Sequence, residues 1–175
     1  MDHSSSLDAY AHMEWADSMV WKVVLDTPEL AEDEYLKNTL LHMHLVQRSF
    51  LWMWIEAADG PVQTSELRPD LDPNPMPAVE LREWARSYYP LLRRWLSEAE
   101  PRLDAIVPFP YGPAIEERLG RKPEQVRVGE ALYQVLAHTM HHRGQVMRRI
   151  RELGGEPPLI DYVAWLWMGR PEPTW

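Results

Sequence analysis

The segment from Val128 to Leu153 constrains the fold more than any other part of the chain. Positions spaced four or three residues apart form one stripe along it: Val128, Leu132, Val135, Thr139, His142, Val146, Ile150 and Leu153. This spacing places the stripe on one face of an α-helix that packs against partner helices. Gly154-Gly155 follows and stops the pattern. The sequence therefore predicts a long helix over residues 129–153 with a buried seam.

Three further segments have helical patterns, so the predicted fold class is all-α, a four-helix bundle. They cover residues 7–25, 32–58 and 78–98. Pro90 lies inside the third segment and should kink it. Acidic residues at the start of the second segment suit the positive end of the helix dipole.

The connections between these helices are predicted to be irregular. Five prolines between residues 61 and 77 exclude regular helix there and indicate a long Pro-rich loop. Residues 103–107 and 125–128 suggest a short β-hairpin before the last long helix, with a helical turn or two between them. Residues 161–167 predict a short C-terminal helix. We expect a single domain over residues 1–175, a length that suits one core.

Composition narrows the classes of function. The net charge of −9 argues against nucleic-acid binding and against anionic membrane surfaces. The chain has no cysteine, which excludes disulfides, thiolate metal ligands and a cysteine nucleophile. No apolar run approaches the ~20 residues of a membrane span, and no signal peptide is evident. The expected compartment is the cytoplasm.

Histidines cluster in the last long helix, where three of the chain's seven lie within residues 138–142. His142 occupies a stripe position, and His138 lies one turn before it, about 40° around the helix. Their rings can therefore converge on one point. His141 lies roughly 100° from His142 and faces away.

A second pair of histidines lies in the second helix and offers a third ligand. His44 shares its face with Leu40, Leu41, Leu51 and Ile55, whereas His42 shares a mixed face with polar and apolar residues. We therefore expect His44 to face the core and to join His138 and His142.

Three imidazoles make a nitrogen-only site, which favours Zn or Ni, with Fe, Co or Cu less favoured. Such a site keeps a position open for water or substrate, as catalytic metals do. A buried, hydrogen-bonded histidine is nevertheless commoner than a ligand, and a metal could also serve only to hold two helices together. The pattern alone leaves these alternatives open.

The segment HTMHHRGQV at residues 138–146 resembles the last helix of the DinB/YfiT-like superfamily. Three other segments resemble parts of the same family: Leu41–Trp52, with a histidine eight residues before a tryptophan, Glu14–Asp17, and Asp161–Val163. The resemblance implies a four-helix bundle, often a homodimer, with a three-histidine metal site. Carried over, the ligands are again His44, His138 and His142.

The resemblance also implies a reaction class. Members of that superfamily include thiol S-transferases that use bacillithiol or mycothiol, so we expect a metal-dependent transferase acting on small electrophiles with a low-molecular-weight thiol cosubstrate. Two alternatives remain: a metal-dependent hydrolase, because an open zinc site can activate water, and a non-catalytic, metal-stabilised stress or binding protein. No residue is assigned a catalytic role, although Asp17 or Glu130 could approach the metal as a base.

Six residues are candidates for surrounding the metal or lining a substrate pocket. Gln145 projects near His138 and could hydrogen-bond a ligand ring or metal-bound water. Arg48 could reach an anionic group of the substrate. The remaining candidates are two possible pocket walls, one possible base and one polar lining residue: Trp15, Trp52, Asp17 and Gln134.

Overall fold

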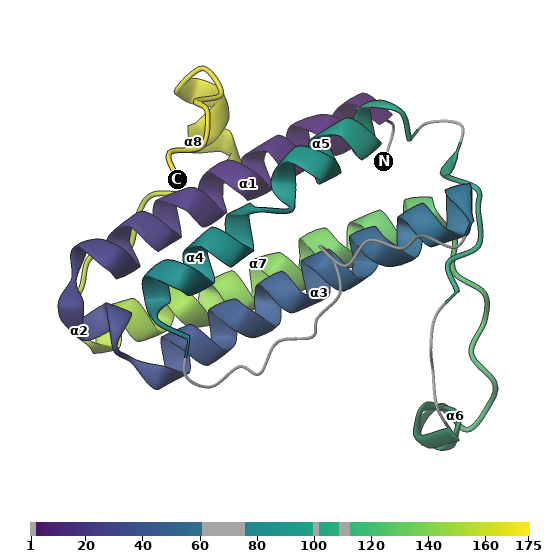
Figure 1. Ribbon diagram of the computed structural model, residues 1–175, viewed down its shortest axis with the longest axis horizontal. Coiled ribbons are helices and arrows are strands. Elements are labelled where there is room, and N and C mark those ends of the chain that lie inside the picture. Colours follow the sequence, from purple (N-terminus) through teal and green to yellow (C-terminus); the bar gives the residue numbers. More distant parts are fainter. Residues whose placement is uncertain (1–2, 61–75, 100–101, 109–112) are drawn as a thin grey trace.

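The computed structural model describes residues 3–60, 76–99, 102–108 and 113–175, and its regular elements are all helices. In chain order they are α1 (His3–Asp26), α2 (Pro28–Ala31), α3 (Glu34–Asp59), α4 (Ala78–Arg86), α5 (Tyr89–Ser97), α6 (Pro113–Leu119), α7 (Val128–Glu152) and α8 (Tyr162–Trp167). In Figure 1, α1 and the α4–α5 pair run along one side of a bundle, and α3 and α7 run along the other. The predicted all-α class and four-helix bundle are confirmed.

The ends of the two helices that matter most for the site follow from their sequences. The Asp33 carboxylate accepts a hydrogen bond of 2.9 Å from the Leu36 amide and caps the start of α3. At the start of α7, the Glu130 carboxylate accepts a hydrogen bond of 2.8 Å from the Arg127 amide. Gly154 follows α7 with φ +80°, a backbone conformation that glycine adopts without strain.

The predicted kink at Pro90 is a complete break in the helix. α4 ends at Arg86, and α5 begins at Tyr89 with Pro90 in its first turn. A proline there costs no helical hydrogen bond, because the first amides of a helix have no intrahelical acceptor. The break places Tyr88 and Tyr89, both almost fully buried, at the middle of the bundle.

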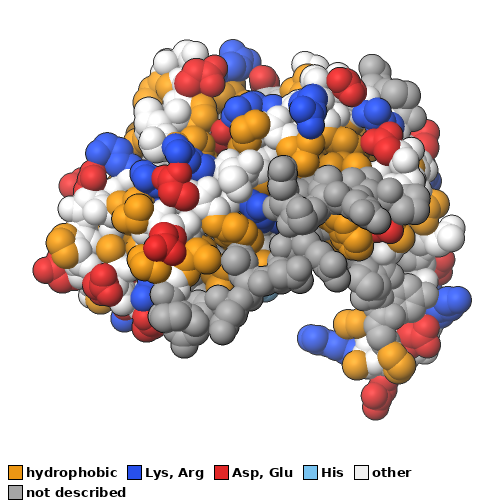
Figure 2. Space-filling view, in the orientation of Figure 1, with side chains coloured by type: hydrophobic (Ala, Val, Ile, Leu, Met, Phe, Trp, Pro, Cys, Tyr) orange, Lys and Arg blue, Asp and Glu red, His pale blue; other side chains and the backbone are white. Residues whose placement is uncertain are grey.

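The predicted hairpin is reduced to a single antiparallel bridge between Ile106 and Arg127. Two backbone hydrogen bonds hold it, from the Val107 amide to Val126 and from the Val128 amide to Ala105. α6 lies between these two segments and buries none of its residues. In Figures 1 and 2 it projects away from the bundle. The predicted C-terminal helix is present as α8, and residues 61–75 of the predicted loop lie outside the described residues.

Two apolar clusters fill the bundle, one toward each end. The first contains residues such as Met13, Trp54 and Leu136, and the second contains residues such as Val20, Leu40 and Ile150. Between them, at the level of the α4–α5 break, each bundle helix contributes buried polar or aromatic hydroxyl groups: Asp17, His44, Gln47, Arg48, Tyr88, Tyr89, Thr139 and Arg143. The bundle thus has a polar layer across its middle.

The outer surface carries interspersed charges of both signs, as the face in Figure 2 shows. None of the helices in the described residues is long and apolar enough to cross a membrane.

Candidate metal centre

Asp17 is the centre of the polar layer, and its carboxylate is fully buried. Oδ1 accepts hydrogen bonds from Nη2 and Nε of Arg143, at 2.8 and 3.1 Å. Oδ2 accepts from Tyr89 at 2.6 Å and from the Gln47 amide at 3.0 Å. Buried charges are tolerated when they are paired and hydrogen-bonded in this way. Asp17 is therefore fully occupied by the core and has no capacity left to act as a base at a metal.

His44 belongs to the same layer, and the structure does not bring this predicted ligand together with His138 and His142. Its ring is fully buried, Nε2 accepts a hydrogen bond of 3.0 Å from the Trp21 indole, and Nδ1 lies 2.8 Å from Oε1 of Gln47. Both ring nitrogens are thus engaged by the protein. Burial lowers the pKa of His44 to about 4, so the ring is neutral at pH 7 and donates through Nδ1.

The third histidine that joins His138 and His142 is His42 instead. One ring nitrogen from each of the three residues can be chosen so that all lie within 4.8 Å of one another. The ring centroids are 4.3 Å apart for His138 and His142, 4.7 Å for His42 and His142, and 5.1 Å for His42 and His138. These rings bridge α3 and α7 on the outer side of the seam between the two helices.

Helix geometry explains why His42 was missed. His42 lies two residues before His44, about 160° around α3 from it, so the two cannot share a face. The apolar neighbours of His44 correctly predicted burial, but burial in the core makes a hydrogen-bonded imidazole rather than an accessible ligand. The mixed face of His42 was the useful signal, because a ligand at the rim of a helix pair needs apolar contacts on one side and solvent on the other.

Gln145 fixes the orientation of one ring in the histidine cluster. Its Oε1 lies 2.8 Å from Nδ1 of His142, and its Nε2 lies 3.2 Å from Nε2 of His141. An amide oxygen can only accept, so Nδ1 of His142 carries the proton and Nε2 keeps its lone pair for a metal. The sequence suggested a hydrogen bond between Gln145 and a ring of the site near His138, and in the structure Gln145 accepts this bond from His142. Orienting contacts of this kind are usual at metal-binding histidines.

The electrostatics of the cluster also suit a cation. Burial, followed by the neighbouring His142, His42 and His141, lowers the pKa of His138 to about 4. Burial and His142 lower the pKa of His42 as well. Neutral imidazoles are the form that binds metals. Nδ1 of His138 is buried and has no hydrogen-bond partner in the described part of the chain, a cost that a bound cation would offset.

Access to the cluster is from the outside of the bundle. His42 is exposed, and His138 and His142 are half-buried. Among the described residues, the cluster of potential metal ligands contains these three histidines and no carboxylate. Glu130, two turns before His138, is held at the start of α7 by the Arg127 amide. The residues present therefore fit a three-nitrogen site with at least one position open to solvent.

The other predicted pocket residues lie elsewhere. Arg48 is buried, donates to the Trp84 carbonyl and the Ser87 hydroxyl, and stacks on the Trp84 ring at 4.4 Å. It stabilises the α4–α5 break and is not placed to reach a substrate at the cluster.

The structure places the two tryptophans in apolar packing. Trp15 is buried against Trp165 of α8, and Trp52 is partly buried against the apolar cluster that contains Met13. Gln134 is exposed on α7, one turn before His138, and has no hydrogen bond to the ligand rings. Aromatic residues at helical spacing predicted packing here better than they predicted a site.

Comparison with known proteins identifies one similarity. A sequence model described as DinB family matches residues 1–173. No curated protein and no solved structure matches the chain.

Proposed function

The chain belongs to the DinB family, and from that premise we propose that it is a divalent-metal-dependent enzyme of the thiol S-transferase class. The observation that carries the proposal is the convergence of His42, His138 and His142 on the solvent side of the α3–α7 seam. With nitrogen ligands only, Zn or Ni is the ion we favour. A divalent cation bound there would stabilise a thiolate by lowering the pKa of its thiol.

The absence of a carboxylate from the described part of the site favours a transferase over a hydrolase. The chain has no cysteine, so the nucleophilic thiol must come from a small cosubstrate. No described carboxylate stands at the histidine cluster to activate water, and both earlier candidates, Asp17 and Glu130, are held by other groups. In the proposed reaction the thiol loses its proton to solvent, a new sulfur–carbon bond forms, and the leaving group departs from the electrophile.

The protein's own contribution is positional. α3 and α7 hold the three rings together, Gln145 presents Nε2 of His142, and the open side faces solvent where two substrates can approach. An enzyme that brings two reactants together at one centre gains rate by orientation alone. A metal that served only to hold the helices together would instead be enclosed by four protein ligands.

Cobalt substitution tests the proposal directly. Protein loaded with Co²⁺ should develop a thiolate-to-metal charge-transfer band in the near ultraviolet when a small thiol is added. His42→Ala should abolish the band. Gln134→Ala, which changes an exposed residue on α7 one turn before His138, should leave it unchanged. Conjugation of the thiol to chlorodinitrobenzene should require the same residues.

Two outcomes would overturn the proposal. If the metal binds but neither the band nor conjugation appears, the cluster is a structural metal site without a catalytic role. If ester hydrolysis depends on His42 while thiol conjugation does not, the centre is a hydrolase.

A further inference from the structure

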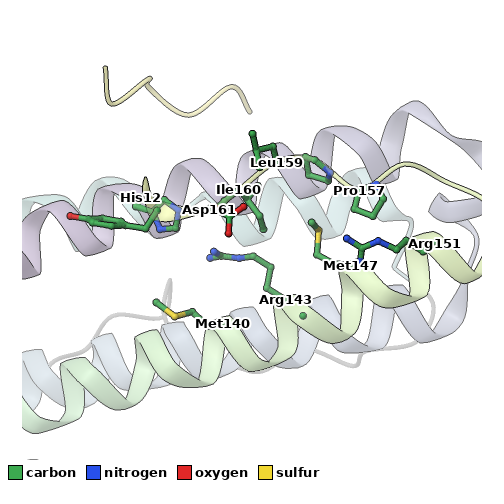
Figure 3. A pocket seen from close by; sticks show the side chains of 12 residues that line it. His12, Met140, Arg143, Met147, Arg151, Pro157, Leu159, Ile160 and Asp161 are labelled. Atoms are coloured by element: carbon green, nitrogen blue, oxygen red, sulfur yellow. Dashed lines mark hydrogen bonds between the residues drawn. The ribbon is translucent and has the colours of Figure 1, made fainter. Parts of the chain in front are cut away.

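A cavity of about 540 Å³ lies on the opposite side of α7 from the histidine cluster. One wall is α7, and the other is the chain segment 157–162, which returns along α1 before α8 (Figure 3). Its volume is in the range of small-molecule sites. The residues of this cavity have no part in the proposed metal chemistry.

Two groups of opposite charge face this cavity with hydrogen-bonding capacity to spare. The hydrogen bonds of Arg143 use Nε and Nη2, and Nη1 makes none of them. Asp161 precedes α8, but its side chain makes no capping hydrogen bond and has no ion pair within the described ranges. Figure 3 shows Arg143 rising from α7 toward the segment that carries Ile160 and Asp161.

His12 forms the floor between these two charges. Its ring is buried, and Nε2 lies 2.8 Å from the Ile160 carbonyl oxygen, so this nitrogen carries the proton and Nδ1 is left as an acceptor. Arg143 and Asp161 line the same cavity as His12, and Figure 3 shows both side chains at the His12 end of it. The resulting head of the cavity offers one guanidinium donor and two acceptors close together.

The rest of the cavity is mainly apolar. Met147 of α7 lies opposite Pro157 and Leu159 (Figure 3). Met140 lies at the end near His12, and Arg151 lies at the far end. Methionine side chains adapt to ligands of varied shape. Arg151 has no ion pair within the described residues, so a cationic ligand tail would meet an uncompensated positive charge.

We propose that this cavity binds an α-amino acid with an apolar side chain. The ligand carboxylate would accept from Nη1 of Arg143, and its ammonium group would donate to Asp161 and to Nδ1 of His12. The carboxylate and ammonium groups of an α-amino acid are attached to the same carbon. They can therefore reach Arg143 and Asp161 at the same end of the cavity. The side chain would lie between Met140 and Met147.

The test compares leucine with two matched analogues: 4-methylpentanoate lacks the ammonium group, and 3-methylbutylamine lacks the carboxylate. Protein labelled with ¹³C at its methionine methyl groups provides nine probes, of which Met140 and Met147 line the cavity. Met140→Leu and Met147→Leu assign their signals. Leucine should shift these two signals, and each analogue should bind at least about tenfold more weakly, because each loses a charge-assisted hydrogen bond. Lysine should also bind more weakly than leucine.

Asp161→Asn should weaken leucine binding by a similar factor. Glu156→Gln, which changes an exposed acidic residue just before the segment and outside the cavity lining, should not change it. Equal binding of leucine and 4-methylpentanoate would refute the recognition of the ammonium group. Unshifted Met140 and Met147 signals at saturating leucine would refute the site itself. Because amino acids can chelate metals, the titration is repeated with His42→Ala. Loss of the signal there would place binding at the histidine cluster and overturn the proposal, whereas retained binding supports it whatever the fate of the proposed enzyme activity.

Discussion

The buried pair of Asp17 and Arg143 should be the most sensitive polar contact in the bundle. Asp17 is completely buried, and the Arg143 side chain is only 5% exposed. Asp17→Ala leaves the guanidinium inside the protein with only the Met13 carbonyl as a partner, at 3.3 Å. Removing one partner of a buried ion pair costs about 3–5 kcal/mol. The same substitution also strands the Tyr89 hydroxyl and the Gln47 amide.

The expected consequence is a large fall in stability with no loss of the metal ligands. At roughly 2–4 °C per kcal/mol for a domain of this size, Asp17→Ala should lower the Tm by about 6–20 °C. Urea unfolding gives the free energy directly. Replacing both partners, in Asp17→Ala/Arg143→Met, should recover part of the loss, because no unpaired charge is then buried.

Asp26→Ala is the matched control on α1. Asp26 pairs with Lys22, but both side chains are more than half exposed, so this pair should contribute less than about 1 kcal/mol. If Asp17→Ala lowers the free energy of unfolding no more than Asp26→Ala does, the Asp17–Arg143 pair does not stabilise the folded protein. If the double variant is as unstable as the sum of the single variants, the two residues are not coupled.

Two further predictions concern the histidines. Gln145→Ala should weaken metal binding about 10–100-fold without abolishing it, because the ring of His142 loses its orienting partner, whereas Gln134→Ala should have no effect in the same chelator competition. Burial lowers the pKa of the His12 ring in the folded protein. As the pH falls, the ring therefore takes up its second proton in the unfolded chain before it does so in the folded chain. The free energy of unfolding should then fall as the pH drops below about 6.5. His12→Gln should make that pH dependence shallower in urea unfolding between pH 7 and pH 5, and an unchanged slope would refute the burial of a neutral ring.

The fold was largely predictable because the helical patterns are local. The 4–3 spacing from Val128 onward marks α7 almost to the residue, and Pro90 marks the break between α4 and α5. The extent of the predicted hairpin was overestimated. β-branched residues near Val107 and Val126 suggest two strands, but the described residues of these segments form only one bridge. Pairing of these segments also depends on the long connection through α6, and no local sequence pattern describes that connection.

The site was only partly predictable, for a physical reason. His138 and His142 follow from spacing along one helix, and the structure keeps them together. The choice between His42 and His44 depends on which side of α3 faces the seam with α7, and apolar neighbours report only which side is buried. Buried polar groups also find hydrogen-bond partners on other helices. The Gln47 amide, for example, donates to the Thr139 hydroxyl 92 residues away, a pairing that is visible only in the folded chain.

The central proposal is that a metal binds the histidine cluster, and that His42, not His44, completes its set of ligands. Its most direct test is the metal content of the untagged protein, measured by elemental analysis, for wild type and four variants that circular dichroism shows to be folded. His42→Ala, His138→Ala and His142→Ala should lose the bound metal, and His44→Gln, which replaces a ring without free nitrogens, should retain it at the wild-type ratio. The account would be contradicted if His44→Gln lost the metal and His42→Ala kept it.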